Sequence, residues 1–162
     1  MNTDSYYQIG SSHKVCEDYA INGKLNHHIS YVVVCDGCSS AFNSDLGARI
    51  LAHSAVDILD TYYRGKKTLG FTKGSSNFAM MEGQFSSSII SKARGIIDQL
   101  GFNDYSSLCS TLLIAVSDGH DTNVFAYGDG AIKVVKWDET VIIHEIEYLS
   151  GSPYYLIYSI NN

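Results

Sequence analysis

Two long helical patterns follow each other in the middle of this sequence, and they constrain its fold more than any other feature. Apolar residues recur at three- and four-residue steps over 44–63, where Leu51, Ala55 and Leu59 fall on one face. A second stripe of the same period covers 77–100. We therefore expect two amphipathic helices that pack together on one outer face of the molecule.

Strand patterns lie on both sides of this helical pair. The run 29–35 is rich in β-branched and aromatic residues and stops at Asp36-Gly37, which predicts a buried strand that ends in a tight turn. After the helices, turns that contain Asp and Gly separate four further strand patterns and predict three successive hairpins. These later strands are expected over 111–116, 122–127, 131–137 and 141–147. The sequence thus predicts an α+β domain with two antiparallel β layers.

The composition supports one domain over residues 1–162 and excludes several classes of protein. With 45% hydrophobic residues, a chain of this length can bury a core without disulfides or a structural metal. Its 11 basic residues are scattered among 17 acidic ones, so nucleic acid is not an expected partner. Apolar runs are far shorter than the ~20 residues of a membrane span, and the first residues lack the features of a signal peptide. We expect a cytoplasmic protein with no membrane partner.

The four cysteines leave two hypotheses open. Cys35 and Cys38 have the Cys-x-x-Cys spacing of zinc sites and thiol redox pairs, but no second pair completes a zinc site. The alternative is that all four, Cys16 and Cys109 included, are free thiols that behave as small hydrophobic side chains. We favour free thiols and predict no zinc or redox site at Cys35 and Cys38.

Acidic residues beside predicted turns are the first candidates for chemistry. Glu17 and Asp18, Asp36, and Asp129 each lie at the end of a predicted strand or in a loop that leaves one. A single one of them is best explained as a solvated turn residue, since Asp favours turns. Several such positions together, in an acidic chain, suit a hard divalent cation, which prefers clustered carboxylate oxygens.

Four segments, taken in order, resemble the metal-dependent protein phosphatase 2C family, in particular its bacterial-type serine/threonine phosphatases. They are Gly-Ser-Ser-His-Lys-Val-Cys-Glu-Asp-Tyr-Ala at 10–20, Val-Val-Cys-Asp-Gly-Cys-Ser-Ser at 33–40, Ser110-Thr111, and Tyr-Gly-Asp-Gly at 127–130. The resemblance implies a two-layer antiparallel β-sandwich flanked by helices, with two Mg²⁺ or Mn²⁺ ions at one end. It also implies a phosphoprotein substrate, whose phosphoserine or phosphothreonine is hydrolysed by a metal-activated water.

The resemblance also assigns roles to individual residues. Asp36 matches the carboxylate that bridges both metal ions, and the Gly37 carbonyl matches a ligand of one of them. Glu17 and Asp18 match the acidic pair that orients metal-bound water. Asp129 matches a residue that reaches a further metal in some members.

His13 departs from the commonest pattern of the family, in which an arginine binds the substrate phosphate at this place. Histidine lacks the two-pronged donor set of a guanidinium, so phosphate binding would be weaker unless Lys14 contributes. Alternatively, His13 is a catalytic proton donor to the leaving oxygen. An exposed loop imidazole without a role is the competing interpretation.

A larger departure concerns the end of the chain. The family places two further metal-binding aspartates beyond the last strands, and a sequence that stops at Asn162 has no counterpart of either. We therefore expect a domain truncated at its C-terminus, about two thirds of the whole, that is weakly active or inactive. An exposed sheet edge would then favour self-association. The main alternative function is a non-catalytic phosphatase-like module that binds a partner.

Overall fold

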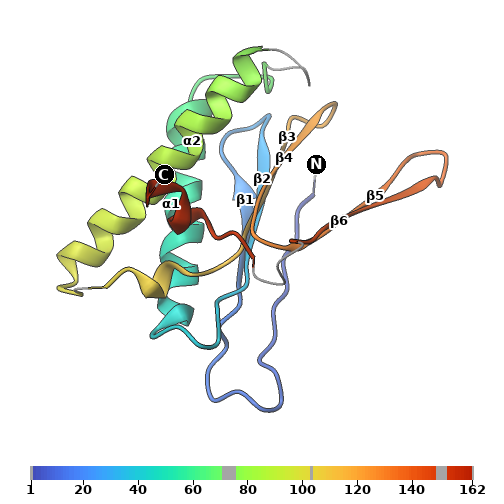
Figure 1. Ribbon diagram of the computed structural model, residues 1–162. Helices are drawn as coiled ribbons and strands as arrows, with labels where there is room; N and C mark the ends of the chain where they lie inside the picture. Colours follow the sequence, from blue (N-terminus) through green and yellow to red (C-terminus); the bar gives the residue numbers. More distant parts are fainter. Residues whose placement is uncertain (1, 71–75, 103, 149–152, 162) are drawn as a thin grey trace.

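The chain folds into two antiparallel sheets and two long helices, an α+β arrangement (Figure 1). The computed structural model describes residues 2–70, 76–102, 104–148 and 153–161. The strands are β1 (Tyr19–Lys24), β2 (Ser30–Cys35), β3 (Leu112–Ser117), β4 (Thr122–Tyr127), β5 (Gly130–Val135) and β6 (Val141–Ile146). The helices are α1 (Ser44–Tyr63) and α2 (Ser76–Gln99), with short 3-10 helices η1 (Ser106–Leu108) and η2 (Leu156–Asn161).

The larger sheet has the strand order β1-β2-β3-β4, and each strand is antiparallel to the next. Tyr19 at the start of β1 pairs with Cys35 at the end of β2. At the same end of the sheet, Leu112 at the start of β3 pairs with Tyr127 at the end of β4. The loops that enter β1 and β3 therefore meet the loops that leave β2 and β4.

Both helices lie on one face of this sheet, as the sequence predicts (Figure 1). The helix boundaries agree with the predicted ones within one residue. Leu51 and Leu59 of α1 are fully buried, as is Ile89 of α2, and they pack in one core with strand residues such as Val33 and Ile114. Leu100, at the end of the predicted second stripe, is 54% exposed because α2 ends just before it.

The prediction of three successive hairpins is wrong at one turn. β3 pairs with β4 and β5 pairs with β6, but β4 and β5 belong to different sheets. Gly128 and Gly130 have φ angles of 92° and 153° at this turn, so the chain bends away from the first sheet. The β5–β6 hairpin extends away from the helices and the main sheet (Figure 1).

The alternation of Ile132 and Val134 with Lys133 is typical of a strand with one packed face and one face in solvent, but β5 has no packed face. Val135, Val141 and Ile143 are 59%, 49% and 58% exposed, and nearly every residue of β5 lies at the surface. Within the described residues, no second layer covers this hairpin.

Candidate functional site

Carboxylates gather at the end of the main sheet where β1 begins and β2 ends. Asp18 directly precedes β1, and Asp36 directly follows β2. Continued by one residue, the Tyr19–Cys35 register places Asp18 opposite Asp36. Asp129 lies in the turn after β4, and its charge acts on Asp36, as do the charges of Asp18 and Glu17. Residues more than 90 positions apart in sequence thus share one electrostatic environment.

The backbone of Asp36 is held by the segment that leads into β3. The Asp36 N–H donates to Thr111 Oγ1 at 2.9 Å, and the Thr111 N–H donates to the Asp36 carbonyl at 2.9 Å. The buried Ser110 hydroxyl donates to the same carbonyl at 2.9 Å. These three bonds fix the direction in which the Asp36 side chain leaves the sheet, which explains the place of Ser110-Thr111 among the sequence signals.

Gly37 is buried where three chain segments meet. Its N–H donates to the Glu17 carbonyl at 3.3 Å, and an isolated β-bridge joins it to Ser110. A Cβ atom at this position would lie 2.7 Å from the Glu17 carbonyl oxygen and 3.0 Å from that of Ser44. Any other residue would push these backbones apart, so the close approach requires glycine.

These residues line a polar cleft of about 450 Å³. Five of the predicted site residues lie in it, namely His13, Glu17, Asp18, Asp36 and Gly37. Lys14 and Asp129 do not line the cleft, and both are exposed. The rest of the lining is Gln8, Gly10, Val15, Cys16, Cys38, Ser39 and Tyr155.

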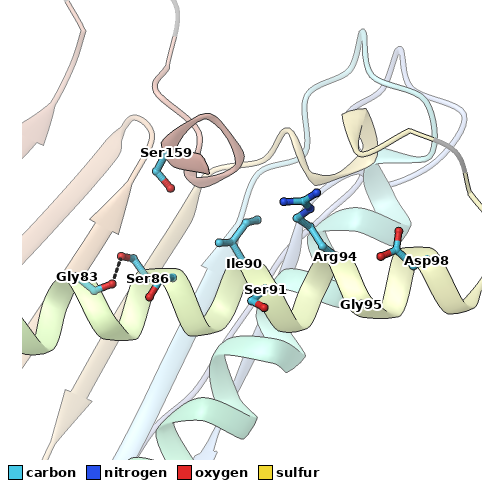
Figure 2. A pocket seen from close by; sticks show the side chains of 9 residues that line it. Gly83, Ser86, Ile90, Ser91, Arg94, Gly95, Asp98 and Ser159 are labelled. Carbon is cyan, nitrogen blue, oxygen red and sulfur yellow. Dashed lines mark hydrogen bonds between the residues drawn. The ribbon is translucent and has the colours of Figure 1, made fainter. Parts of the chain in front are cut away.

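A larger cavity of about 610 Å³ lies elsewhere, between α2 and η2 (Figure 2). Its space arises from small side chains on α2, including Gly83, Ser91 and Gly95, with Arg94 and Asp98 beside them (Figure 2). It contains no gathering of carboxylates. The smaller cleft is therefore the candidate functional site, because that is where charged groups converge.

Like charges and partial burial dominate the electrostatics of the cleft. Although Asp36 as a whole residue is exposed, the surrounding protein removes enough water from its carboxyl group to raise its pKa. Asp18 raises it further through its charge and as a hydrogen-bond partner, and Asp129 and Glu17 add to the effect. Together these causes raise the pKa of Asp36 to about 6. The cleft is therefore short of positive charge.

His13 is the basic group nearest to these carboxylates in the cleft lining. Its Nδ1 lies 2.7 Å from Glu17 Oε2, and the Glu17 side chain is much less exposed than the imidazole. This contact orients the ring. The Nε2 atom is left to act on a ligand.

Tyr155 is the functional candidate that sequence reasoning missed. It precedes η2, is 9% exposed, and lines the cleft. Burial, a hydrogen bond with Cys38 and the charge of Asp129 raise the pKa of Tyr155. No periodicity or motif near the end of the chain indicates this contact, which depends on how η2 packs.

The Cys-x-x-Cys pair is split between two environments. All four cysteines are free thiols. Cys35 is fully buried, and burial raises its pKa strongly, whereas Cys38 lines the cleft. Among the residues that the structure describes, no three His, Cys, Asp or Glu side chains converge at metal-site spacing.

A protein-family comparison matches residues 9–146 to protein phosphatase 2C. The chain belongs to the protein phosphatase 2C family. The matched range contains every predicted site residue, from His13 to Asp129. No curated protein and no solved structure matches the chain.

Membership in the protein phosphatase 2C family indicates a hydrolase of the protein phosphatase type. The family is generally metal-dependent, with Mg²⁺ or Mn²⁺, and its substrates are phosphoproteins. In the described part of the chain, neither helix is both long and apolar enough to cross a membrane.

The raised pKa of Asp36 predicts a stability effect with a definite sign. The carboxyl group of Asp36 binds its proton more tightly in the native protein than in the unfolded chain. Protonation of Asp36 therefore stabilises the fold at low pH, and this stabilisation is lost as the pH rises through about 6. Asp36→Asn should therefore stabilise the metal-free protein at pH 7.5 by about 1 kcal/mol, after allowance for solvent screening. The gain should shrink as the pH falls from 6 towards 4.

Urea unfolding in the presence of a chelator, at several pH values, measures this difference. Asp57→Asn is the matched control, since Asp57 is an exposed residue of α1 whose partner is Lys92 at 3.0 Å. Equal effects of the two substitutions, or a gain that does not depend on pH, would contradict the electrostatic origin.

Proposed function

We propose that this chain is a metal-dependent phosphatase that hydrolyses phosphoserine and phosphothreonine in proteins. The observation that carries the proposal is that Glu17, Asp18 and Asp36 line one cleft, and that the charge of Asp129 acts on Asp36 from outside the lining. Like charges at such a site raise the free energy of the empty protein, and a bound cation relieves them.

The donor types suit Mg²⁺ or Mn²⁺, although no three of the described His, Cys, Asp or Glu side chains converge at metal-site spacing. Both are hard cations that prefer carboxylate and carbonyl oxygens, and the cleft offers the Asp36 carboxylate and the backbone of Gly37 on a rigid loop. Asp36 and the Gly37 carbonyl would hold the metal ions. When bound, such ions supply Lewis acidity for a water nucleophile and neutralise charge on the phosphoryl group.

Glu17 and Asp18 would act through hydrogen bonds. Both lie in the cleft beside Asp36 and are too exposed to be structural core residues. Carboxylates in such places orient water ligands without replacing them. Glu17 also anchors His13 at 2.7 Å, so one residue links the water network to the imidazole.

His13 would hold a proton at Nε2. With Nδ1 fixed by Glu17, the other ring nitrogen can donate to the serine or threonine oxygen that leaves phosphorus. The same imidazolium can bind a phosphate oxygen, though without the bidentate geometry of arginine. Lys14 is exposed and lies outside the cleft lining, so its contribution would be long-range.

We further propose that the described carboxylates assemble a two-metal centre poorly on their own. Asp36 is the one side chain among the described residues that the family resemblance assigns to direct coordination of both ions. Further carboxylates would add charge and ligands for the ions. The alternative, a phosphatase-like module that binds phosphoproteins without hydrolysis, follows if the metal site is too weak.

Activity and metal binding should both depend on Asp36. With millimolar Mn²⁺, we expect slow hydrolysis of p-nitrophenyl phosphate. Asp36→Asn should reduce this rate at least about a hundredfold, because each 1.4 kcal/mol of lost transition-state stabilisation slows the reaction tenfold. Mn²⁺ should also raise the melting temperature of the unmodified chain but not that of Asp36→Asn.

Asp57→Asn is again the control and should retain both the activity and the melting shift. Activity that survives Asp36→Asn would contradict the metal site. A melting shift without activity, together with binding of a phosphothreonine peptide, would favour the non-catalytic module.

The two roles of His13 can be separated by the choice of leaving group. p-Nitrophenolate leaves without protonation, whereas a serine or threonine alkoxide needs a proton. A proton donor at Nε2 therefore predicts that His13→Ala reduces kcat on a phosphothreonine peptide about a hundredfold, and on p-nitrophenyl phosphate less than about tenfold. His144→Ala, on the exposed strand β6, should change neither rate. Equal losses on both substrates with a raised KM would assign His13 to phosphate binding alone.

We also propose that β5 and β6 belong to the second sheet of a β-sandwich, and that while uncovered they mediate self-association. Val135 pairs with Val141, and Ile143 pairs with Lys133, so one face of the hairpin carries an exposed apolar patch of Val135, Val141 and Ile143. Such a patch beside free strand edges is a site for pairing with another copy.

Self-association through this patch should be sensitive to charge. Ile143→Lys would place two lysines opposite each other in the hairpin, so we expect the dimer dissociation constant to rise at least about tenfold. Leu100→Lys, at a similarly exposed position after α2, is the control. Sedimentation over a range of concentrations measures both variants, and a strict monomer at every concentration would contradict the proposal.

A further inference from the structure

Two cysteines that are distant in sequence, Cys38 and Cys109, lie opposite each other beside the cleft. The bridge between Gly37 and Ser110 is antiparallel, so the next residues along, Cys38 and Cys109, face each other across it. The Cys38 N–H donates to the Cys109 carbonyl at 2.9 Å. Opposite residues of an antiparallel pair have Cα atoms about 4.5 to 5.5 Å apart, within the range found in disulfides.

The two side chains leave the same face of this bridge. Opposite residues of an antiparallel pair have Cβ atoms about 5 Å apart, against about 4 Å in a disulfide, so a small approach would join the sulfurs. The Cys38 charge also acts on Cys109, where it adds to the rise in pKa that burial causes. Both thiols are partly exposed, and each lines a cleft open to solvent.

Two tyrosines from the C-terminal segment cover these sulfurs. The Tyr158 hydroxyl lies 3.7 Å from Cys109 Sγ. Tyr155 lines the same cleft as Cys38, which acts on the Tyr155 hydroxyl, and the Cys38 sulfur also lies 3.1 Å from Ser40 Oγ. η2 and the Tyr155 that precedes it therefore lie against both members of the pair, and η2 also packs against α2 (Figure 1).

The other two cysteines are unsuitable partners. Cys35 is fully buried at the end of β2, where its side chain faces the core. Cys16 lies in the cleft but in the loop before β1, outside the bridge that brings Cys38 and Cys109 together.

We propose that Cys38 and Cys109 form a reversible intramolecular disulfide on exposure to a hydroperoxide, and that this bond releases η2 from the cleft. Cys38 Sγ attacks the peroxide oxygen, the O–O bond breaks, and the alcohol or water leaves with the thiol proton. Cys109 Sγ then attacks the sulfur of the resulting sulfenic acid and expels water. Two thiols are oxidised by two electrons, and the peroxide is reduced.

Release of η2 follows from the loss of its partners. A disulfide has no S–H to donate and draws both sulfurs towards each other, so Tyr155 and Tyr158 lose the contacts that hold them. Tyr155 forms part of the cleft wall, and its departure would open the site to solvent. A cellular dithiol would restore the reduced form by thiol exchange.

The test uses the full chain with a chelator present, so that its outcome does not depend on metal binding. After treatment with a small excess of hydrogen peroxide, intact mass should fall by two hydrogen atoms, and peptide mapping should join the segments that contain Cys38 and Cys109. Cys38→Ser and Cys109→Ser should each abolish the link, whereas Cys16→Ser should retain it. Dithiothreitol should reverse the change.

Hydrogen exchange reports on η2. The Tyr158 N–H donates to the Tyr155 carbonyl at 3.0 Å, and its exchange should accelerate at least about tenfold in the oxidised protein. Circular dichroism checks that the serine variants fold. A Cys35–Cys38 link, a link between chains, or oxidation to sulfinic acid without a link would overturn the proposal. A Cys38–Cys109 link with unchanged exchange would overturn the release of η2.

Discussion

The pairing register of the main sheet is the constraint on which the site depends. Because β1 and β2 pair with Tyr19 opposite Cys35, the two residues just beyond them, Asp18 and Asp36, are forced to face each other. A slip of one residue would turn every side chain of a strand to the other face and would expose the buried Val33. The hydrophobic core on the helix side therefore holds the carboxylates in register, even though the carboxylates themselves repel.

The repulsion between these carboxylates destabilises the site, while other parts of the molecule stabilise the fold. The pKa of Asp36 rises to about 6 because burial and three neighbouring carboxylates oppose its charge. The unfavourable energy is offset elsewhere, by α1, α2 and the apolar strand faces that contain no such conflict. An arrangement of this kind is typical of sites built to receive a cation, where the missing positive charge comes from the ligand.

The segment between η1 and β3 contacts both the loop that carries Asp36 and the C-terminal helix η2. Ser110 and Thr111 hold the backbone of Asp36 through three hydrogen bonds, while Cys109 beside them contacts Tyr158 of η2. A short series of contacts thereby links the C-terminal segment to the loop that carries Asp36 and Gly37. Tyr155 makes the connection direct, because it packs on Cys38 and lines the same cleft.

Local patterns in the sequence determined the two helices and most of the strands, although none of them predicts β1. The order of the motifs, and not local periodicity, indicates most of the acidic residues of the cleft. The period of apolar residues predicts α1 and α2 within one residue, and Asp36-Gly37 after an apolar run predicts where β2 ends. These features arise from neighbours in the chain, so sequence alone suffices. The order of the motifs indicates the protein phosphatase 2C family, and the family comparison over residues 9–146 establishes it. Only the tertiary structure decided that β5 leaves the first sheet, that Tyr155 enters the cleft, and that Cys38 faces Cys109 and not Cys35. Each of these depends on contacts between segments far apart in the chain, and the packing of the whole molecule selects such contacts.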